Sequence, residues 1–136
     1  MALVTKTQIE GMFQNGNNSS TAGDFVSLLF EIRTNAHIAH LQTKSFAFHK
    51  ATDELYSDIV GAADAFVEAY QGKFGIITGY KCTNIFEGGD FVAYLQQCMT
   101  KIESYRSTLS SGYLEQLVDN IQELLSTTLY KLVNLH

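Results

Sequence analysis

The residues of this chain best suited to bind a metal ion or to catalyse a reaction are histidines and carboxylates at regular spacing. Three of the four histidines fall within 13 residues, and acidic residues follow them. Imidazole and carboxylate together suit iron, zinc or manganese, and hard oxygen ligands favour iron or manganese over copper. We therefore predict a site for iron or another divalent metal. Its candidate ligands are His37, His40, His49, Asp53, Asp64 and Glu68.

The spacing of these residues places most of them on one side of a helix. His49 with Asp53, and Asp64 with Glu68, are four residues apart, so each pair shares a helical face. Eleven residues, about three turns, separate Asp53 from Asp64, and the two pairs therefore form one stripe. That stripe lies opposite the apolar face of its own helix, so we expect it to point away from the core.

One chain cannot use both pairs at a single metal centre. Asp53 and Asp64 are about 16 Å apart along a helix that rises 1.5 Å per residue. A two-fold partner that lays the same helix antiparallel across the stripe would bring one pair to the other. A metal site built from both pairs therefore requires a dimer, because its ligands come from two chains. The residues expected near the two-fold axis are Tyr56, Val60 and Gly61.

A second interpretation of the same stripe requires no metal. Carboxylates on the outer side of a long helix are commonly a solvated surface, and a histidine near a helix C-terminus interacts with the helix dipole. On this interpretation the chain is a metal-free helical bundle, an interaction or structural protein that dimerises through the helix expected over residues 45–73.

Apolar residues at helical spacing indicate four helices that position these side chains. Ser20 or Thr21 is the expected cap of the first helix. No alternating pattern typical of strands extends beyond a few residues. The expected ranges are about 24–42, 45–73, 90–109 and 112–135, with a further short helix over about 5–14.

The lengths of the connections predict the topology. Short turns join the first helix to the second and the third to the fourth, so each pair should form an antiparallel hairpin. Residues 74–89 lie between the hairpins and are too many for a tight turn. Two hairpins joined by one long crossover is the connectivity of ferritin-like bundles. We expect one all-α domain over 1–136, a ferritin-like four-helix bundle with 1–20 as a lead-in; the alternative is an up-down bundle with a decorated loop.

The segment over residues 37–75 resembles the core of the Dps-type mini-ferritins. In that family a histidine that ends one helix is followed at fixed intervals by His, Asp, Asp and Glu. The resemblance implies that the protein binds iron, and oxidises Fe²⁺ with peroxide or oxygen, at a site shared by two chains. It implies that Asp64 and Glu68 hold the metal and that the other ligands come from the facing chain. The residues that reproduce the spacing are His37, His49, Asp53, Asp64 and Glu68.

Some features depart from that family's pattern. Ile38 follows His37 where the family commonly has an aromatic residue, no basic-Gly turn follows, and the basic tail with which some members hold DNA is missing. His40 lies closer than His37 to the expected helix end and competes for the ligand role. The resemblance further implies a homo-oligomer, which is a two-fold dimer or a larger cage built from such dimers. More loosely, the chain is similar to uncharacterised small helical proteins of marine microbes and their phages.

Composition and charge exclude several classes of partner. The 136 residues carry a net charge of −5, which opposes binding to nucleic acid or to an anionic membrane. No apolar run approaches the roughly 18 residues of a transmembrane helix, and residues 1–20 lack the pattern of a secretory signal. The chain has two cysteines, Cys82 and Cys98, and no proline. We expect a cytoplasmic protein with reduced thiols and long helices.

Overall fold

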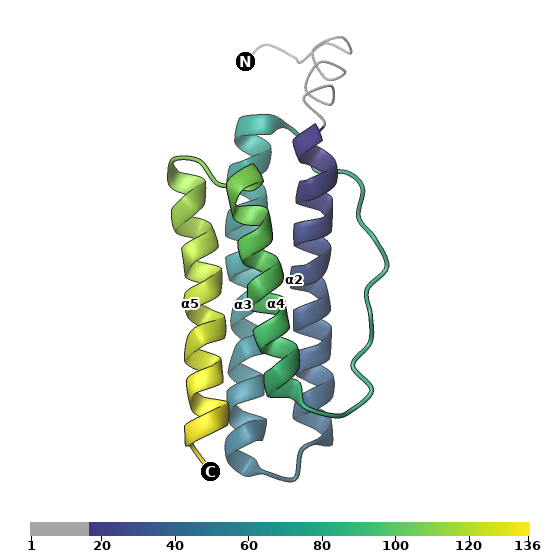
Figure 1. Ribbon diagram of the computed structural model, residues 1–136, viewed down its shortest axis with the longest axis vertical. Coiled ribbons are helices and arrows are strands. Elements are labelled where there is room, and N and C mark those ends of the chain that lie inside the picture. Colours follow the sequence, from purple (N-terminus) through teal and green to yellow (C-terminus); the bar gives the residue numbers. More distant parts are fainter. Residues whose placement is uncertain (1–16) are drawn as a thin grey trace.

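The computed structural model describes residues 17–136, which form four long helices (Figure 1). Within that range there is no strand, and the prediction of an all-helical chain is confirmed. The short helix expected over 5–14 lies outside the described residues. The helices are α2 (Asn17–Gln42), α3 (Phe46–Phe74), α4 (Phe91–Leu109) and α5 (Tyr113–Asn134).

The start of α2 differs from the sequence prediction, whereas the other helices agree with it to within one residue. α2 begins at Asn17 rather than near Asp24, and the predicted cap at Ser20 or Thr21 is wrong because both residues lie inside the helix. Asn and Ser favour caps and turns through their side-chain hydrogen bonds. The helix nevertheless extends through these residues to Ala22, which is fully buried in the core.

Apolar side chains from all four helices meet in one core. The rings of Phe25 and Phe66 pack edge to face with centroids 4.9 Å apart, and Cys98 of α4 is 1% exposed. Thr128 of α5 is buried, and its hydroxyl donates to the carbonyl oxygen of Leu124 at 2.8 Å. The apolar faces that the sequence predicts for the helices are therefore buried within one chain. No helix among residues 17–136 combines the length and apolar character needed to cross a membrane.

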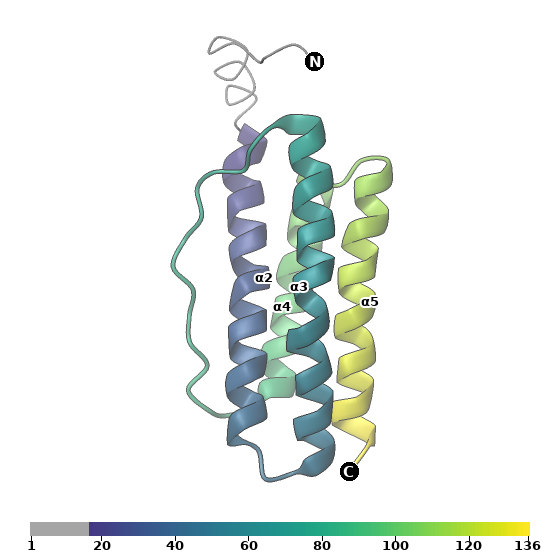
Figure 2. The same cartoon turned by 180° about the vertical axis from the view of Figure 1, so that it is seen from behind.

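The four helices form two hairpins. α2 and α3 are antiparallel neighbours, as are α4 and α5, and residues 75–90 run along the outside of α2 between the two hairpins (Figures 1 and 2). We call residues 75–90 the strap. The main helix contacts are those of α2 with α3 and α4, and of α5 with α3 and α4.

Polar side chains of α2 hold the strap in place. Ser27, Glu31 and Asn35 are spaced four residues apart on one side of the helix. Ser27 Oγ accepts a hydrogen bond from the strap N–H of Lys81 at 3.0 Å. Glu31 Oε1 accepts from the N–H of Asn84 at 2.9 Å. The three α2 side chains are buried, and we call them the polar ladder.

Asn35 is the most highly connected member of the polar ladder. Its Oδ1 accepts from the N–H of Phe86 at 2.8 Å. Its Nδ2 donates to the carbonyl oxygen of Asn84 and to the hydroxyl of Tyr94, each at 2.8 Å. The Tyr94 hydroxyl in turn donates to Glu31 Oε2 at 2.8 Å. The ladder therefore joins α2, the strap and α4.

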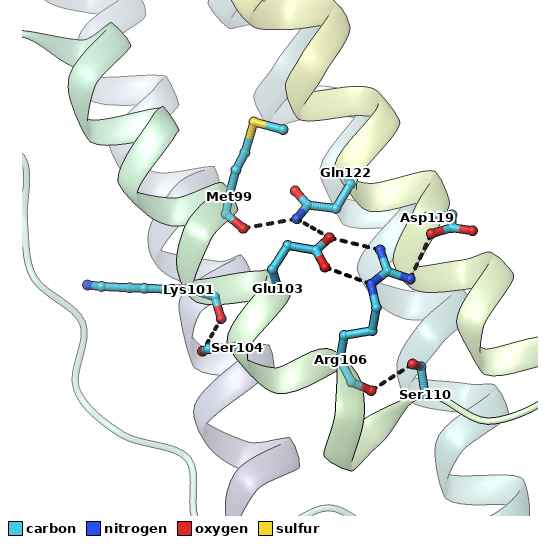
Figure 3. A network of polar contacts seen from close by, with 8 residues as sticks. All are labelled: Met99, Lys101, Glu103, Ser104, Arg106, Ser110, Asp119 and Gln122. Atoms are coloured by element: carbon cyan, nitrogen blue, oxygen red, sulfur yellow. Dashed lines mark hydrogen bonds and ion pairs between the residues drawn. The ribbon is translucent and has the colours of Figure 1, made fainter.

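A partly exposed network joins α4 to α5 (Figure 3). Arg106 of α4 donates from Nε to Glu103 at 2.9 Å and pairs through Nη1 with Asp119 of α5 at 2.7 Å. Gln122 of α5 donates to Glu103 at 3.0 Å and to the carbonyl oxygen of Met99 at 2.9 Å. We call this network the clasp.

Candidate functional site

The three histidines that the sequence singled out gather where α2 turns into α3. The rings of His40 and His49 stack with centroids 3.6 Å apart. The ring of His37 lies 6.1 Å from that of His40 and stacks on Tyr56 at 4.3 Å. The hairpin thus brings together residues from the last turns of one helix and the first turns of the next.

His40 and His49 close the turn with a reciprocal pair of hydrogen bonds. The Nδ1–H of His40 donates to the carbonyl oxygen of His49 at 2.8 Å, and the Nδ1–H of His49 donates to the carbonyl oxygen of His40 at 2.9 Å. Each Nδ1 carries the hydrogen because a carbonyl oxygen only accepts. The His40 carbonyl lies in the last turn of α2, where carbonyls have no intrahelical partner. We call this pair the histidine lock, a structural role that the spacing did not reveal.

Asp53 lies one turn farther along α3, beside Tyr56. A hydrogen bond to Asp53 raises the pKa of the Tyr56 hydroxyl, and burial and the negative charge of Asp53 raise it further. Because His37 stacks on Tyr56, the side chains of His37, Tyr56 and Asp53 form one row between α2 and α3.

Asp64 and Glu68 lie farther along α3, and both are exposed. Within one chain the structure does not bring them to the histidines. Among residues 17–136 there is no group of three or more His, Cys, Asp or Glu side chains that could hold a metal ion. Iron binding between facing chains stays a prediction.

Two pockets adjoin on the outer side of α2 and α3. One, of about 230 Å³, is lined by Phe30 and Asp64 among others, and the second, of about 380 Å³, by residues that include His37 and Tyr56. Arg33 and Val60 line both pockets. We call this surface the outer face, and its defining residues are Phe30, Arg33, His37, Tyr56, Val60 and Asp64.

Large apolar side chains border these pockets and remain in contact with solvent. Phe30 and Val60 are each 40% exposed, and Leu41 is 70% exposed. A Cβ added at Gly61, which follows Val60 on α3, would meet nothing within 4 Å. Glycine in a helix costs about 1 kcal/mol relative to alanine, and contacts within the chain do not account for it here. It leaves room for another backbone to approach closely.

Charge is divided across the outer face. On the α2 side the exposed cation is Arg33. The described acids of α2 point elsewhere, since Asp24 pairs with Lys81 of the strap and Glu31 belongs to the polar ladder. On the α3 side three acids outnumber one exposed base, Lys50. The acids are half-buried Asp53 and exposed Asp64 and Glu68.

Sequence reasoning missed the polar ladder, although it leaves a signal in α2. Gly23, Ser27, Glu31 and Asn35 recur at intervals of four in a helix whose other faces are largely apolar. Small or polar residues repeated every four positions indicate a side of the helix that does not pack against the hydrophobic core. The pattern does not identify the partner, which is the backbone of the strap.

Comparison with known proteins identifies relatives without assigned functions. Residues 40–132 match a family described as "Family of unknown function (DUF5856)". An uncharacterised 14.6 kDa protein from the mobD-ri intergenic region of Enterobacteria phage T4 is 36% identical over 63 residues, which cover 46% of this chain and 49% of the phage protein. The chain thus matches about half the length of that relative. No solved structure matches it.

These matches contradict the resemblance to the Dps-type mini-ferritins, because the family that matches is a different one. The resemblance depended on five residues, and two pairs four residues apart on a long helix are enough to reproduce most of that spacing. In this fold His49 instead serves the histidine lock, and His37 packs on Tyr56. The match to the family model covers α3, the strap, α4 and nearly all of α5. The chain belongs to the DUF5856 family.

Proposed function

We propose that this protein is a helical-bundle interaction module that dimerises through its outer face and requires no metal ion to do so. The supporting observation is that two adjoining pockets, exposed apolar side chains and an open glycine occur on one surface. Isolated exposed apolar residues are ordinary on a monomer, whereas a group of them around pockets is typical of an interface.

The order of the helices supports a ferritin-like connectivity for this bundle, with two hairpins and one long crossover. The proposed role uses that connectivity only as a scaffold. Tyr80 of the strap stacks on Phe30 at the border of the outer face, with ring centroids 5.9 Å apart, and no strap residue lines either pocket. Cys82 and Cys98 are free thiols, which supports a reducing, cytoplasmic environment.

Light scattering coupled to size-exclusion chromatography tests the proposal. In EDTA we expect a species of about 30 kDa, twice the 15.1 kDa of one chain. Val60→Glu should raise the dimer dissociation constant by at least about tenfold, because it places a charge at the centre of the apolar contact. Val133→Glu is the matched control on α5, where the valine is also exposed; it should leave the dissociation constant unchanged.

Three results would contradict this function. The first is a wild-type chain that stays monomeric at every concentration. The second is equal weakening by Val60→Glu and Val133→Glu, which would locate the contact elsewhere. The third is a dimer that dissociates in EDTA and returns with Fe²⁺, which would favour the predicted metal site between chains.

A further inference from the structure

The outer face can meet a second copy of itself in two ways. If the two-fold axis lies in the interface and crosses the helices, α2 faces α2 and α3 faces α3. If the axis lies in the interface and runs parallel to the helices, α2 of each chain faces α3 of the other. Both arrangements are isologous, so the same surface serves both chains.

The first arrangement sets Asp53 against Asp64 at two points of the contact. Centred between Asp53 and Asp64, an antiparallel pair of α3 helices brings Asp53 of one chain to Asp64 of the other, and symmetry repeats the contact. The nearest cation of α3 is exposed Lys50, which in this arrangement lies beside Glu68 of the other chain and leaves the two Asp53–Asp64 contacts unpaired. Like charges that face each other across an interface oppose binding and suppress that pairing.

The second arrangement is complementary in charge. Arg33 of α2 lies level with Val60 and Asp64 of α3, because all three line one pocket. Rotation about an axis parallel to the helices preserves that level and exchanges the α2 side for the α3 side. Arg33 of each chain then faces Asp64 of the other, and the contact occurs twice.

The apolar groups of the outer face fit the same arrangement. His37 and Tyr56 are stacked, so they lie at the same height along the bundle. In the second arrangement His37 of each chain therefore faces Tyr56 of the other. Val60 lines both pockets and lies close to the axis. Gly61 leaves α3 without a side chain where α2 of the second copy passes over it.

We infer that the partner of the outer face is a second copy of this chain, packed with α2 over α3 around an axis parallel to the bundle. This inference rests on the proposed function, which requires only that the face self-associates. It adds the orientation of the two chains and the ion pair between Arg33 of one and Asp64 of the other.

Reciprocal charge variants test the orientation. In the Arg33→Glu homodimer two carboxylates face each other where the ion pair was, and in the Asp64→Arg homodimer two cations do. Each substitution should therefore raise the homodimer dissociation constant by about tenfold or more. Mixed in equal amounts, the two variants should form a heterodimer with a dissociation constant within about threefold of the wild type. Native mass spectrometry separates the species, with circular dichroism to confirm equal helicity.

Two charge reversals outside the outer face serve as controls. Asp58→Arg changes an exposed acid of α3, and Lys101→Glu changes an exposed base of α4. Neither should change the homodimer dissociation constant, and mixing them should give no preference for the heterodimer.

Disulfide trapping gives an independent measurement of the orientation. In a Cys82→Ser background, Ser57→Cys would lie beside its own copy if α3 faced α3, and mild oxidation would then link the chains. With α2 over α3 the two introduced thiols are far apart, and we expect no such link.

The outcomes separate the two proposals. Preferential heterodimer formation without a Ser57→Cys disulfide supports the α2-over-α3 arrangement. A dimeric wild type whose charge variants show no such preference, or whose Ser57→Cys variant links readily, overturns the orientation and leaves the proposed function standing. A monomeric wild type overturns both.

Discussion

The polar ladder and the clasp are both side-chain networks between segments distant in sequence, but they lie in opposite environments. Glu31 and Asn35 of the ladder are 8% and 1% exposed, whereas the side chains of Glu103 and Asp119 in the clasp are each 52% exposed. The clasp carboxylates are open to water, which can replace their partners, whereas the ladder side chains are largely shielded from it. Location, rather than the number of contacts, should therefore decide how much each network stabilises the fold.

The kind of partner differs as well. The ladder side chains accept hydrogen bonds from backbone N–H groups of the strap. Those groups need partners wherever they are shielded from water, because a buried donor without one costs about 1–3 kcal/mol. The ion pairs of the clasp join charged side chains that salt and solvent screen.

Removal of Asn35 is the strongest test of this comparison. Asn35→Ala deprives the Phe86 N–H, the Asn84 carbonyl and the Tyr94 hydroxyl of a partner. We expect the free energy of unfolding to fall by about 2–4 kcal/mol. Urea denaturation followed by circular dichroism measures it. Asn120→Ala, at an exposed amide of α5 that pairs with Gln116, should change it by less than about 0.5 kcal/mol; equal losses would refute the role of burial.

Gly23 tests how closely the strap packs on α2. A Cβ at this position would lie 2.4 Å from the carbonyl oxygen of Thr78 and 2.7 Å from that of Gly79. Gly23→Ala should therefore destabilise the protein by about 1–3 kcal/mol, despite the roughly 1 kcal/mol that alanine gains in a helix.

The matched control for Gly23 is Gly72 in α3, where an added Cβ meets nothing within 4 Å. Gly72→Ala should stabilise the protein by up to about 1 kcal/mol through helix propensity. Thermal and urea unfolding of both variants provide the measurement. A stabilised Gly23→Ala protein would show that the strap does not press on α2.

The clasp should give the smallest effect. Arg106→Ala should lower the free energy of unfolding by at most about 1 kcal/mol, less in high salt. The hydrogen bond from Arg106 lowers the pKa of Glu103 below its ordinary 4.5. The stabilisation that Arg106 gives through Glu103 is therefore fully present above pH 4.5. It is lost as the pH falls through the lowered pKa of Glu103 in the folded protein. Urea denaturation at neutral and acidic pH should show the two proteins converging in acid; a constant difference would contradict this origin.

Local patterns predicted most of the fold. α3, α4 and α5 end within one residue of the expected bounds, because the spacing of their apolar residues is regular and Ser45 and Asp90 cap two of them. The start of α2 escaped prediction, because Asn and Ser favour a turn by local preference, yet the helix begins at Asn17.

The candidate site was less predictable. Helical spacing correctly indicated that Asp64 and Glu68 point away from the core, and both are exposed. It did not reveal the histidine lock, which depends on the geometry of the turn between α2 and α3. The polar ladder has partners on the strap backbone, about 50 residues away, and backbone groups leave no signal in a sequence.

The histidine lock has a consequence for the order in which this chain can acquire structure. It joins residues nine positions apart, whereas the ladder joins residues 49 to 63 positions apart. Closing the longer loops costs about 1.5 kcal/mol more in chain entropy. A ribosome releases the chain from its N-terminus, so both histidines emerge before any residue of the strap. The first hairpin can therefore close while the second is still being synthesised, and α2 is in place to receive the strap as it emerges.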